Sequence, residues 1–328
     1  MKVLVIGLGS MGKRRLRNLK ALGIDAVAGV DPRPDRRAEA AKIRALPTFA
    51  SLEEGLNAFS PDALVISTPP DQHMDCAFLA ARRGLPCFIE ASVVDAERIL
   101  ELQRLTEERG PLIAPSCTMR YFPGPRKVKE LIAVGAIGKV LNVNYHTGQY
   151  LRDWHPWEAI EDYYVSKRAT GGCREIVPFE LTWLNDVFGD PQPLACLRGR
   201  VGDLRIDIDD IYYCWLRYPG NVTASITVEV LSRPAATREL RVLGSDGQLV
   251  FSADDNSVRV CSVASPSWIH HELQRGRAAD GYINPEEPYV AELGDFLGAV
   301  SSRGRFPNSL LDDYRVLQVL NELEAKTV

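Results

Sequence analysis

The 328-residue sequence lacks several features that would place it in other classes of protein. Its seven cysteines are an odd number and none stands in a C-x-x-C pair, so reduced thiols explain them better than disulfides or zinc. No apolar run reaches the roughly 18 residues of a membrane span, and no signal peptide is visible. The formal net charge of −4 gives no electrostatic reason to expect a nucleic-acid partner. We therefore expect a cytoplasmic protein with no membrane and no nucleic acid among its partners.

A glycine-rich turn near the N-terminus is the most informative stretch that is present. The β-branched run 3–6 leads into G-x-G-x-x-G, and leucines at helical spacing follow. Strand, glycine turn and helix thus come in the order of a dinucleotide-binding fold, with an anion expected at the helix N-terminus. Gly7 permits the tight turn, Gly9 lets the backbone approach a pyrophosphate, and Gly12 allows close packing of helix on strand. The cofactor-binding residues expected here are Gly7, Gly9, Ser10, Met11 and Gly12.

An acidic residue follows the second apolar strand, 26–30, at the place where it would accept the ribose hydroxyls. This residue is Asp31, about 20 positions after the last glycine. A carboxylate here would repel a 2′-phosphate, so we expect NAD to be preferred. Arg33, two residues on, could instead reach a phosphate, which leaves NADP as an alternative.

The order of elements predicts an α/β protein of two domains. Up to about residue 118, apolar strands alternate with helices, which indicates a Rossmann-type, doubly wound parallel sheet. Asp95 is expected to cap one of these helices. The predicted strands are 3–6, 26–30, 63–67, 86–89 and 112–114, and the later helices are 32–45, 71–83 and 96–109.

From residue 119 the pattern changes to strands that alternate in polarity and are joined by hairpin signals. These strands are 140–147, 211–218, 222–230, 238–243, 248–252 and 258–262. They predict a C-terminal α+β domain, 119–328, with an open, mainly antiparallel sheet. Helices near 288–301 and 309–325 close the chain and could pack back on the NAD-binding domain, 1–118. One face of such a sheet needs cover, so we expect a homodimer or homotetramer packed through it.

Several motifs over nearly the whole chain resemble the Gfo/Idh/MocA oxidoreductases. They are the glycine turn 7–12, S-T-P-P-D-Q-H at 67–73, R-Y-F-P at 120–123, G-A-I-G-K-V at 135–140 and the aromatic stretch 148–158. The resemblance implies hydride transfer between a nicotinamide and a sugar or cyclitol hydroxyl. It also implies cofactor contacts from the loops after two further strands, at Ser67, Thr68, Pro69, His73 and Glu90.

The chain departs from this family at two catalytic positions. The family's lysine stands in E-K-P, where this chain reads Glu90-Ala91-Ser92. The family's acid and histidine stand four residues apart on one helix, where this chain has Glu175 and Phe179, with Pro178 between them. An alanine and a phenylalanine can neither donate nor accept a proton. A catalytically silent dinucleotide-binding or regulatory protein, and non-redox or net-neutral chemistry on a sugar, are therefore alternatives to a dehydrogenase.

Other residues could handle the proton. Glu175 is the first candidate, because an apolar pocket would raise its pKa toward neutrality; in the alternative, an arginine such as Arg174 neutralises it and it only holds the helix. His155, in an aromatic loop, is a second candidate, with packing or substrate binding as its alternative. Tyr163 and Lys167 have the Y-x-x-x-K spacing by which a lysine lowers a tyrosine's pKa, or they lie on a solvated helix face.

A sugar site is the other expectation, with aromatic faces against the ring and a cation for a phosphate or carboxylate. Alternatively, the aromatic side chains pack in the core, and Arg174 and Glu175 form an ion pair on the surface. The candidates are Arg120, Trp154, His155, Trp157, Tyr163, Arg174 and Glu175.

We expect no metal site. The acidic run of Asp207, Asp209 and Asp210 alternates with isoleucines, which favours a half-buried strand over calcium ligands. His270 and His271 are adjacent and lack further ligand spacing. The sequence as a whole favours an NAD-dependent oxidoreductase acting on a sugar or nucleotide-sugar hydroxyl or ketone, with a non-standard catalytic set.

Overall fold

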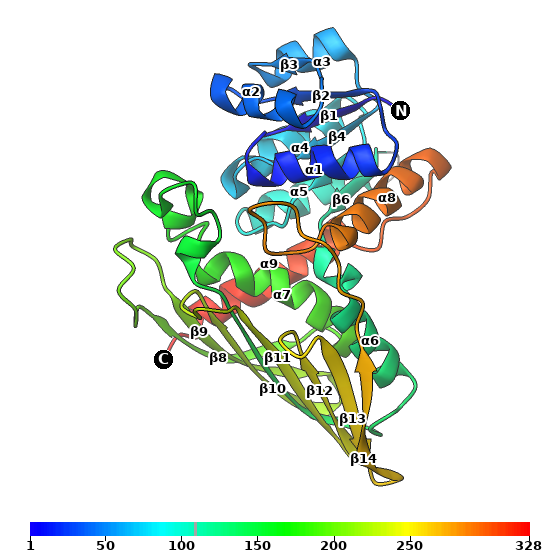
Figure 1. Cartoon of the computed structure of the whole chain (residues 1–328), viewed down its shortest axis with the longest axis vertical. Helices are drawn as coiled ribbons and strands as arrows, with labels where there is room; N and C mark the ends of the chain where they lie inside the picture. Colours follow the sequence, from blue (N-terminus) through cyan, green and yellow to red (C-terminus); the bar gives the residue numbers. More distant parts are fainter. Residues whose placement is uncertain (108–109) are drawn as a thin grey trace. The chain divides into compact units, whose positions relative to one another are not determined.

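A computed structural model describes residues 1–107 and 110–328. The chain forms two compact units (Figure 1). The first consists of Met1–Thr118 and Glu286–Tyr314, and the second of Met119–Pro285 and Arg315–Val328.

The first unit contains a six-stranded, entirely parallel sheet in the order β3-β2-β1-β4-β5-β6. Its strands are β1 (Val3–Ile6), β2 (Val27–Val30), β3 (Thr48–Phe49), β4 (Ala63–Ile66), β5 (Cys87–Ile89) and β6 (Ile113–Pro115). Chain order reverses between β1 and β4, and this switch point is where ligands bind in open α/β sheets. The predicted doubly wound Rossmann sheet is confirmed.

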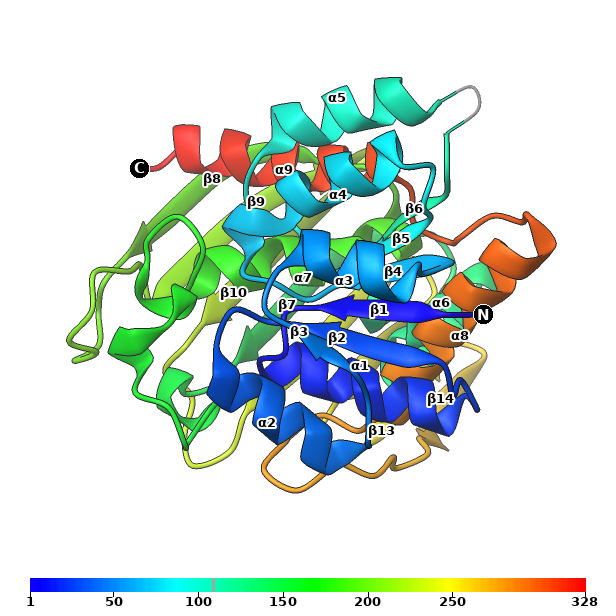
Figure 2. The ribbon, with the colours of Figure 1, turned by 90° about the horizontal axis from the view of Figure 1, so that it is seen from above.

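Helices cover both faces of this sheet, which explains why β1, β2 and β4 are buried along their whole length. Figure 2 shows α1 and α2 on one face, and α4 and α5 on the other. The helices are α1 (Ser10–Ala21), α2 (Pro34–Ile43), α3 (Leu52–Phe59), α4 (His73–Arg82), α5 (Ala96–Thr106) and α8 (Glu287–Ser302). The pattern of the sequence did not predict β3 and α3, which are short.

The prediction that the Asp95 side chain caps α5 is wrong. Asp95 does occupy the position before the helix, but its backbone is left-handed (φ 65°) and its side chain caps no backbone N–H. The carboxylate instead lies 3.6 Å from the Arg98 guanidinium. The helix is described to Thr106, and residues 108 and 109 of the predicted range 96–109 lie outside the described residues.

A buried ion cluster joins four segments of the first unit, which are α1, the loop after β5, α8 and the segment after β6. Arg15, on α1, is fully buried and makes two hydrogen bonds to Glu90, with Nε to Oε1 at 2.7 Å and Nη2 to Oε2 at 2.8 Å. Its Nη2 also donates to Glu292 of α8 at 3.0 Å. Glu292 accepts further bonds from Ser116, Cys117 and Thr118, after β6. Every charge in the cluster is thus paired and hydrogen-bonded, as burial requires.

The second unit contains an eight-stranded sheet in the order β14-β13-β12-β11-β7-β10-β9-β8. Only β7 and β10 pair in parallel, so the predicted mainly antiparallel sheet is confirmed. The hairpins after β9, β11 and β12 follow the predicted turns. The strands are β7 (Val140–Gly148), β8 (Gln192–Gly199), β9 (Ile211–Tyr218), β10 (Val222–Glu229), β11 (Thr237–Gly244), β12 (Gly247–Ser252), β13 (Ser257–Ser262) and β14 (Ser265–Glu272).

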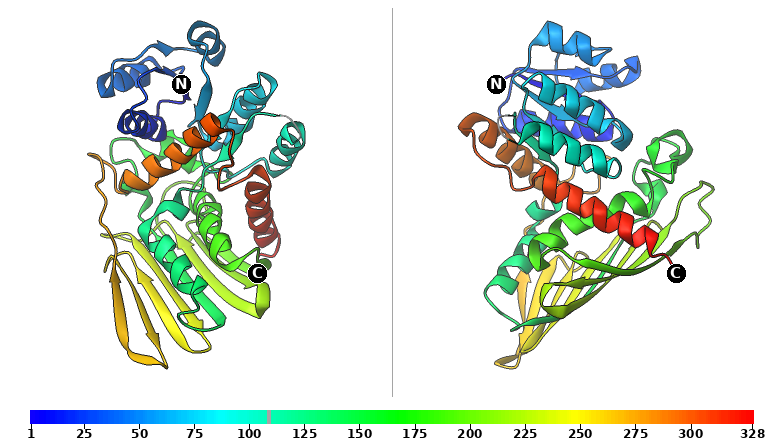
Figure 3. Two further views of the ribbon diagram at one scale, coloured as in Figure 1. Left: turned by 90° about the vertical axis from the view of Figure 1, so that its right-hand side faces the viewer. Right: turned by 180° about the vertical axis from the view of Figure 1, so that it is seen from behind.

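Helices α6 (Pro123–Ala133) and α7 (Cys173–Phe188) pack on one face of this sheet, as Figure 3 shows. The other face carries exposed apolar side chains. On β9, residues alternate strictly, with Tyr212 and Cys214 buried while Tyr213 and Trp215 are 41% and 49% exposed. Leu197 of β8, directly opposite Tyr213, is 48% exposed. Helix α9 (Leu310–Ala325) begins in the first unit and continues in the second.

The acidic run before β9 is not the strand that the sequence predicted. Residues 206–208 form a bend and residues 209 and 210 are irregular, although the burial of this run does alternate. Asp207 and Asp209 instead bind the guanidinium of Arg168, at 2.8 and 2.6 Å. Asp210 is buried and accepts two backbone N–H groups, from residues 201 and 202.

Across residues 1–107 and 110–328, no group of three or more His, Cys, Asp and Glu side chains is arranged to hold a metal ion. No helix in this part of the chain is long and apolar enough to cross a membrane. All seven cysteines are free thiols.

Candidate functional site

At two of the three loop glycines, neighbouring backbone atoms leave no room for a side chain. Gly7 has a φ of +85°, and a Cβ there would lie 2.5 Å from the carbonyl oxygen of Ser67, in the loop after β4. A Cβ on Gly12 would lie 1.8 Å from the carbonyl oxygen of Gly7. The loops after β1 and β4 are therefore in direct contact at the switch point of the sheet.

Gly9 is different, because a Cβ there would meet no backbone atom within 4 Å. The nearest atom is a guanidinium nitrogen of Arg36, 3.5 Å away. Gly9 precedes the first residue of α1 with an ordinary φ of −69°, and the first turn of α1 carries no acidic side chain. The open space, the N-terminus of α1 and a nearby cation together fit a pyrophosphate at this position.

Asp31 is buried at the end of β2, and both its oxygens are held by backbone N–H groups. Oδ2 accepts from Leu8 of the glycine loop at 2.8 Å, and Oδ1 accepts from Arg33 at 2.9 Å. The Arg33 side chain points to Asp35 instead, with contacts of 2.6 and 3.2 Å, and this hydrogen bonding lowers the pKa of Asp35 to about 2. Asp31 therefore lies beside the glycine loop as a fixed acceptor, as ribose binding needs.

The loop after β4 is shaped by His73. Burial lowers the pKa of this imidazole, so it is neutral, and its Nε2 lies 2.9 Å from the carbonyl oxygen of Thr68. The Thr68 hydroxyl and His73 Nδ1 are buried without a hydrogen-bond partner. Buried polar atoms normally find partners, so these two fit a site that a polar ligand completes. Pro69 ends this part of the loop, before the short 3-10 turn Pro70–Gln72.

Glu90 has a structural role that its position did not indicate. Both its oxygens bind Arg15, and the Ser67 hydroxyl also donates to Oε1 at 3.0 Å. Glu90 thus fixes the loops after β4 and β5 through protein contacts. Arg15 and Glu292 were not predicted, because residues so far apart in sequence carry no shared local pattern.

In the second unit, Glu175 lies in the first turn of α7. Its Oε1 accepts a hydrogen bond of 2.6 Å from the hydroxyl of Tyr164, and its Oε2 is buried without a partner. Burial raises the pKa of Glu175 to about 7, against the opposing effect of the Tyr164 hydrogen bond. The carboxyl can therefore hold or release a proton near neutral pH. Tyr164 was not predicted, since the Y-x-x-x-K spacing pointed to its neighbour.

Three of the predicted aromatic residues do gather in the second unit. The His155 ring stacks on Trp157 at 5.3 Å and lies 5.0 Å from the Tyr163 ring. The Trp154 indole N–H and the Tyr163 hydroxyl are buried without a partner. Burial, with the nearby carboxylates of Glu175 and Glu158, raises the pKa of Tyr163.

This upward shift contradicts the lysine-activated tyrosine that the spacing predicted. Tyr163 has an extended backbone (φ −135°, ψ 176°), so it does not share a helix face with Lys167, which is exposed. The alternative of a solvated helix face is wrong for the same reason.

The two predicted arginines are held elsewhere in the second unit. Arg174 binds Glu324 of α9 at 2.9 Å and the carbonyl of Ala169 at 2.8 Å. Arg120 donates to the carbonyl of Thr182 at 3.0 Å, so it braces α7. Neither neutralises Glu175, whose hydrogen-bond partner is Tyr164. Helix α7 also runs through Pro178 to Phe188, so the proline does not end it.

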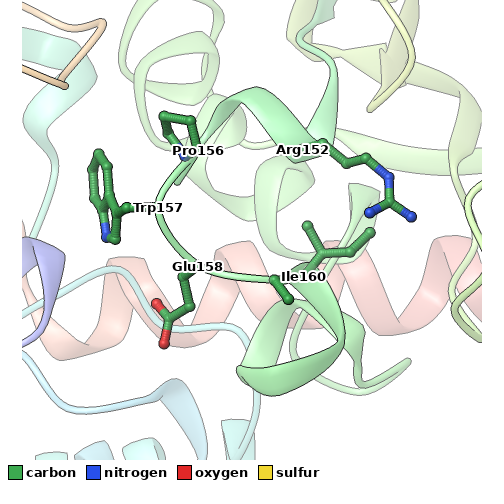
Figure 4. Close-up of a pocket in the computed structure, with 6 residues that line it drawn as sticks. Arg152, Pro156, Trp157, Glu158 and Ile160 are labelled. Atoms are coloured by element: carbon green, nitrogen blue, oxygen red, sulfur yellow. The ribbon is translucent and has the colours of Figure 1, made fainter.

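A shallow pocket of about 340 Å³ lies at the aromatic stretch and is drawn in Figure 4. Its lining comes from one loop, residues 152 and 156–160. The side chains of Arg152, Trp157 and Glu158 point in different directions from this loop (Figure 4). Because they do not converge on one point, the pocket alone does not define a substrate site.

Comparisons with known proteins agree with the geometry of the two units. Residues 1–115 match the family described as an oxidoreductase family with an NAD-binding Rossmann fold, and residues 126–250 match the GFO/IDH/MocA C-terminal domain. Inositol 2-dehydrogenase of Leifsonia xyli subsp. xyli is 31% identical over 147 residues, which is 43% of either chain. Trans-1,2-dihydrobenzene-1,2-diol dehydrogenase of Oryctolagus cuniculus is 26% identical over 80% of this chain and 74% of its own.

Solved structures share the whole fold at low sequence identity. An oxidoreductase from Agrobacterium radiobacter in complex with NAD+, L-tartaric acid and magnesium has a TM-score of 0.85 and 15% identity, covering 99% of this chain and 96% of its own. Levoglucosan dehydrogenase in complex with NADH and levoglucosan has a TM-score of 0.84 and 17% identity, covering 99% and 97%. At such identities the likeness shows the fold.

The glycine geometry predicts opposite outcomes for two alanine substitutions. Gly9→Ala should fold with nearly unchanged thermal stability, because its Cβ meets only a flexible arginine. It should weaken NADH binding by roughly tenfold or more, because a methyl group would stand where the backbone meets the pyrophosphate. Gly12→Ala is the matched control, and should lower the melting temperature because its Cβ collides with backbone. Fluorescence titration and thermal melting measure both effects; full NADH affinity in Gly9→Ala would contradict this assignment.

Proposed function

Because the chain belongs to the Gfo/Idh/MocA oxidoreductase family, with an NAD-binding Rossmann domain, we propose that it is an NAD-dependent oxidoreductase acting on a sugar or nucleotide-sugar hydroxyl or ketone. The single observation that carries the proposal is the glycine loop, where Gly9 leaves open space in front of the α1 N-terminus. The named activities of similar proteins, on inositol and levoglucosan, support a polyhydroxylated substrate.

The first unit supplies the groups that would bind the dinucleotide. The N-terminus of α1, with Ser10 and Met11 in its first turn, would meet the pyrophosphate, and Asp31 would accept the ribose hydroxyls. Thr68 and His73 offer unpartnered polar atoms in the loop after β4. When bound, the nicotinamide would take up or deliver the hydride.

Asp31 also supports NAD over NADP as the cofactor. Its carboxylate is fixed beside the glycine loop, where a 2′-phosphate would meet like charge. The side chain of Arg33, which could have favoured NADP, is instead paired with Asp35.

The second unit supplies the group that would move the proton, and we assign this role to Glu175. In alcohol oxidation its unpartnered Oε2 would take the hydroxyl proton while the hydride leaves carbon. The Tyr164 hydroxyl orients the carboxylate from its other oxygen. Near a pH of 7 both forms of Glu175 are populated, so it could serve either direction of the reaction.

The aromatic residues around His155 would bind the sugar ring by stacking, with Trp157 half exposed. The buried indole N–H of Trp154 and hydroxyl of Tyr163 lack partners, so they could bind substrate oxygens. This assignment makes Tyr163 a hydrogen-bonding residue, since its raised pKa opposes a role as base.

A second candidate function is a dinucleotide-binding protein without catalysis. It is favoured by Ala91 and Phe179, which carry no titratable group where the family has a lysine and a histidine. The two functions share cofactor binding and differ in turnover.

Replacement of Glu175 tests the proposed acid/base role. Glu175→Gln should retain NADH affinity and lower turnover by about a hundredfold or more, because the amide cannot exchange the proton. In the wild type, sugar oxidation should rise with pH through about 7, as the carboxylate forms. The measurement is the pH profile of NAD+ reduction, with a substrate found by screening cyclitols, anhydrosugars and nucleotide-sugars.

Tyr164→Phe tests whether the pKa of Glu175 sets the pH profile. The Tyr164 hydrogen bond lowers the pKa of Glu175, so its loss should move the profile to higher pH. Tyr163→Phe, one residue away and without this bond, should leave the midpoint in place. Unchanged turnover in Glu175→Gln would exclude the role and make His155 the next residue to replace.

We also propose that two or more copies associate through the exposed sheet face of the second unit. The row of Leu197, Tyr213 and Trp215 is large and apolar for a solvated surface. Trp215→Glu should therefore shift the protein from a homodimer or homotetramer toward monomer, as read by light scattering. Leu105→Glu, which changes an exposed leucine of α5 in the first unit, is the matched control. A wild type that is monomeric at micromolar concentration would contradict this interface.

A further inference from the structure

Two cysteines lie directly opposite each other at one edge of the sheet in the second unit. Cys196 of β8 is in register with Cys214 of β9, and both are free thiols. They are 0% and 1% exposed. Directly opposite residues of paired strands point to the same face of a sheet. The two sulfurs therefore lie together on the buried face, whereas the neighbouring Tyr213 and Trp215 point to the exposed face.

The backbone of Cys196 shows which kind of cross-strand pair this is. Its N–H donates to the carbonyl of Lys326 at 3.2 Å, and its carbonyl accepts from the N–H of Val328 at 2.9 Å. The N–H and C=O of one strand residue point to the same side of the strand, so both groups of Cys196 point away from β9. Cys196 and Cys214 are therefore a non-hydrogen-bonded pair, in which the Cα atoms are typically about 4.5 Å apart.

Such a pair fits the geometry of a disulfide bond. Disulfides join cysteines whose Cα atoms are about 4.4–6.8 Å apart. Of the two kinds of antiparallel pair, the non-hydrogen-bonded kind brings the opposite side chains closer together. A bond between the two sulfurs would therefore need little movement of β8 against β9.

The two thiols differ in acidity. A hydrogen bond from the Cys214 thiol lowers the pKa of Cys196, with help from the Arg198 guanidinium and against the effect of burial. The carboxylates of Glu324 and Asp209 also oppose this shift. The same hydrogen bond, together with burial, raises the pKa of Cys214. Since the thiolate is the reactive form of cysteine, Cys196 is the nucleophile of the pair and Cys214 reacts second.

Burial limits which oxidant could reach the pair. A sulfur without exposed surface is closed to a bulky reagent such as oxidised glutathione, whereas hydrogen peroxide, little larger than water, can enter through small local openings. Residues 326–328, which pair with β8 at Cys196, are themselves exposed. Opening of this short pairing would uncover the edge of β8 beside the thiol.

We propose that Cys196 and Cys214 are a peroxide-sensitive pair that closes to a reversible disulfide between β8 and β9. The Cys196 thiolate attacks one oxygen of hydrogen peroxide, so that the O–O bond breaks, hydroxide leaves and a sulfenic acid forms. The Cys214 sulfur then attacks the sulfenic sulfur, the S–S bond forms and a second hydroxide leaves. The two thiol protons convert both hydroxides to water, and two electrons pass from the sulfurs to the peroxide.

This modification is separate from the proposed function, because it needs neither the glycine loop nor Glu175. It would join the two strands beneath the exposed row of Leu197, Tyr213 and Trp215, since each cysteine neighbours a member of that row along its own strand. The bond would also close a loop of residues 196–214, which restricts the unfolded chain and stabilises the folded one.

Mass spectrometry of the full-length protein after treatment with hydrogen peroxide tests the pair. The wild type should lose the mass of two hydrogen atoms, peptide mapping should find Cys196 linked to Cys214, and dithiothreitol should restore both thiols. Cys196→Ala and Cys214→Ala should each abolish the link. Cys173→Ala is the matched control, because Cys173 is a third buried thiol that acts on Cys214, and it should leave the link intact.

Thermal melting of the same proteins gives a second measurement. The treated wild type should melt several degrees higher than the untreated protein, and dithiothreitol should reverse the rise. Treated Cys214→Ala should show no such rise, and cooperative melting before treatment shows that this variant is folded.

Three results would overturn the pair. The first is a treated wild type in which both thiols stay free or are oxidised without a link between them. The second is a link that uses Cys173 and is lost in Cys173→Ala. The third is addition of glutathione to Cys196 in the folded protein, which would show that the sulfur is open to bulky reagents.

Discussion

The elements of the first unit are held together by the buried guanidinium of Arg15. Arg15 is fully buried, and its guanidinium joins α1 to Glu90 after β5 and to Glu292 of α8. These elements come from distant parts of the chain, and each contributes to the edge of the sheet where the glycine loop lies. Loss of one partner from such a cluster typically costs about 3–5 kcal/mol, because an uncompensated charge stays buried. Glu90 also accepts a hydrogen bond from Ser67, so the ion pair with Arg15 helps to fix the loop after β4.

Burial also sets the chemistry of the remaining carboxyls. Glu90 and Glu292 face Arg15, whereas Glu175 accepts a hydrogen bond from the neutral hydroxyl of Tyr164. Desolvation raises the pKa of Glu175 and that of Asp313 to about 7, and it also raises the pKa of Glu292 against the opposing effect of Arg15. A chain that lacks the family's lysine and histidine therefore still has two groups able to exchange a proton near neutral pH.

The features that could be predicted from the sequence are those that a short stretch of residues determines by itself. The G-x-G-x-x-G turn, Asp31 and the alternation along β9 each follow from a short stretch with one dominant constraint, and the sheets they predict are present. Contacts between residues far apart in the sequence leave no local pattern from which they could be predicted. The partner of Glu90 is 75 positions away, and Glu175 binds Tyr164 although the spacing to Lys167 pointed to Tyr163. Asp95 had the right residue type for a cap, but its left-handed backbone directs the carboxylate elsewhere.

Binding of a nicotinamide dinucleotide by the first unit, with Asp31 selecting NAD, is the property on which the proposed function depends. Parallel fluorescence titrations with NADH and NADPH test it most directly. We expect saturable binding of NADH and at least about tenfold weaker binding of NADPH, since a 2′-phosphate would meet the fixed carboxylate. Binding of neither cofactor, or equal or tighter binding of NADPH, would contradict it.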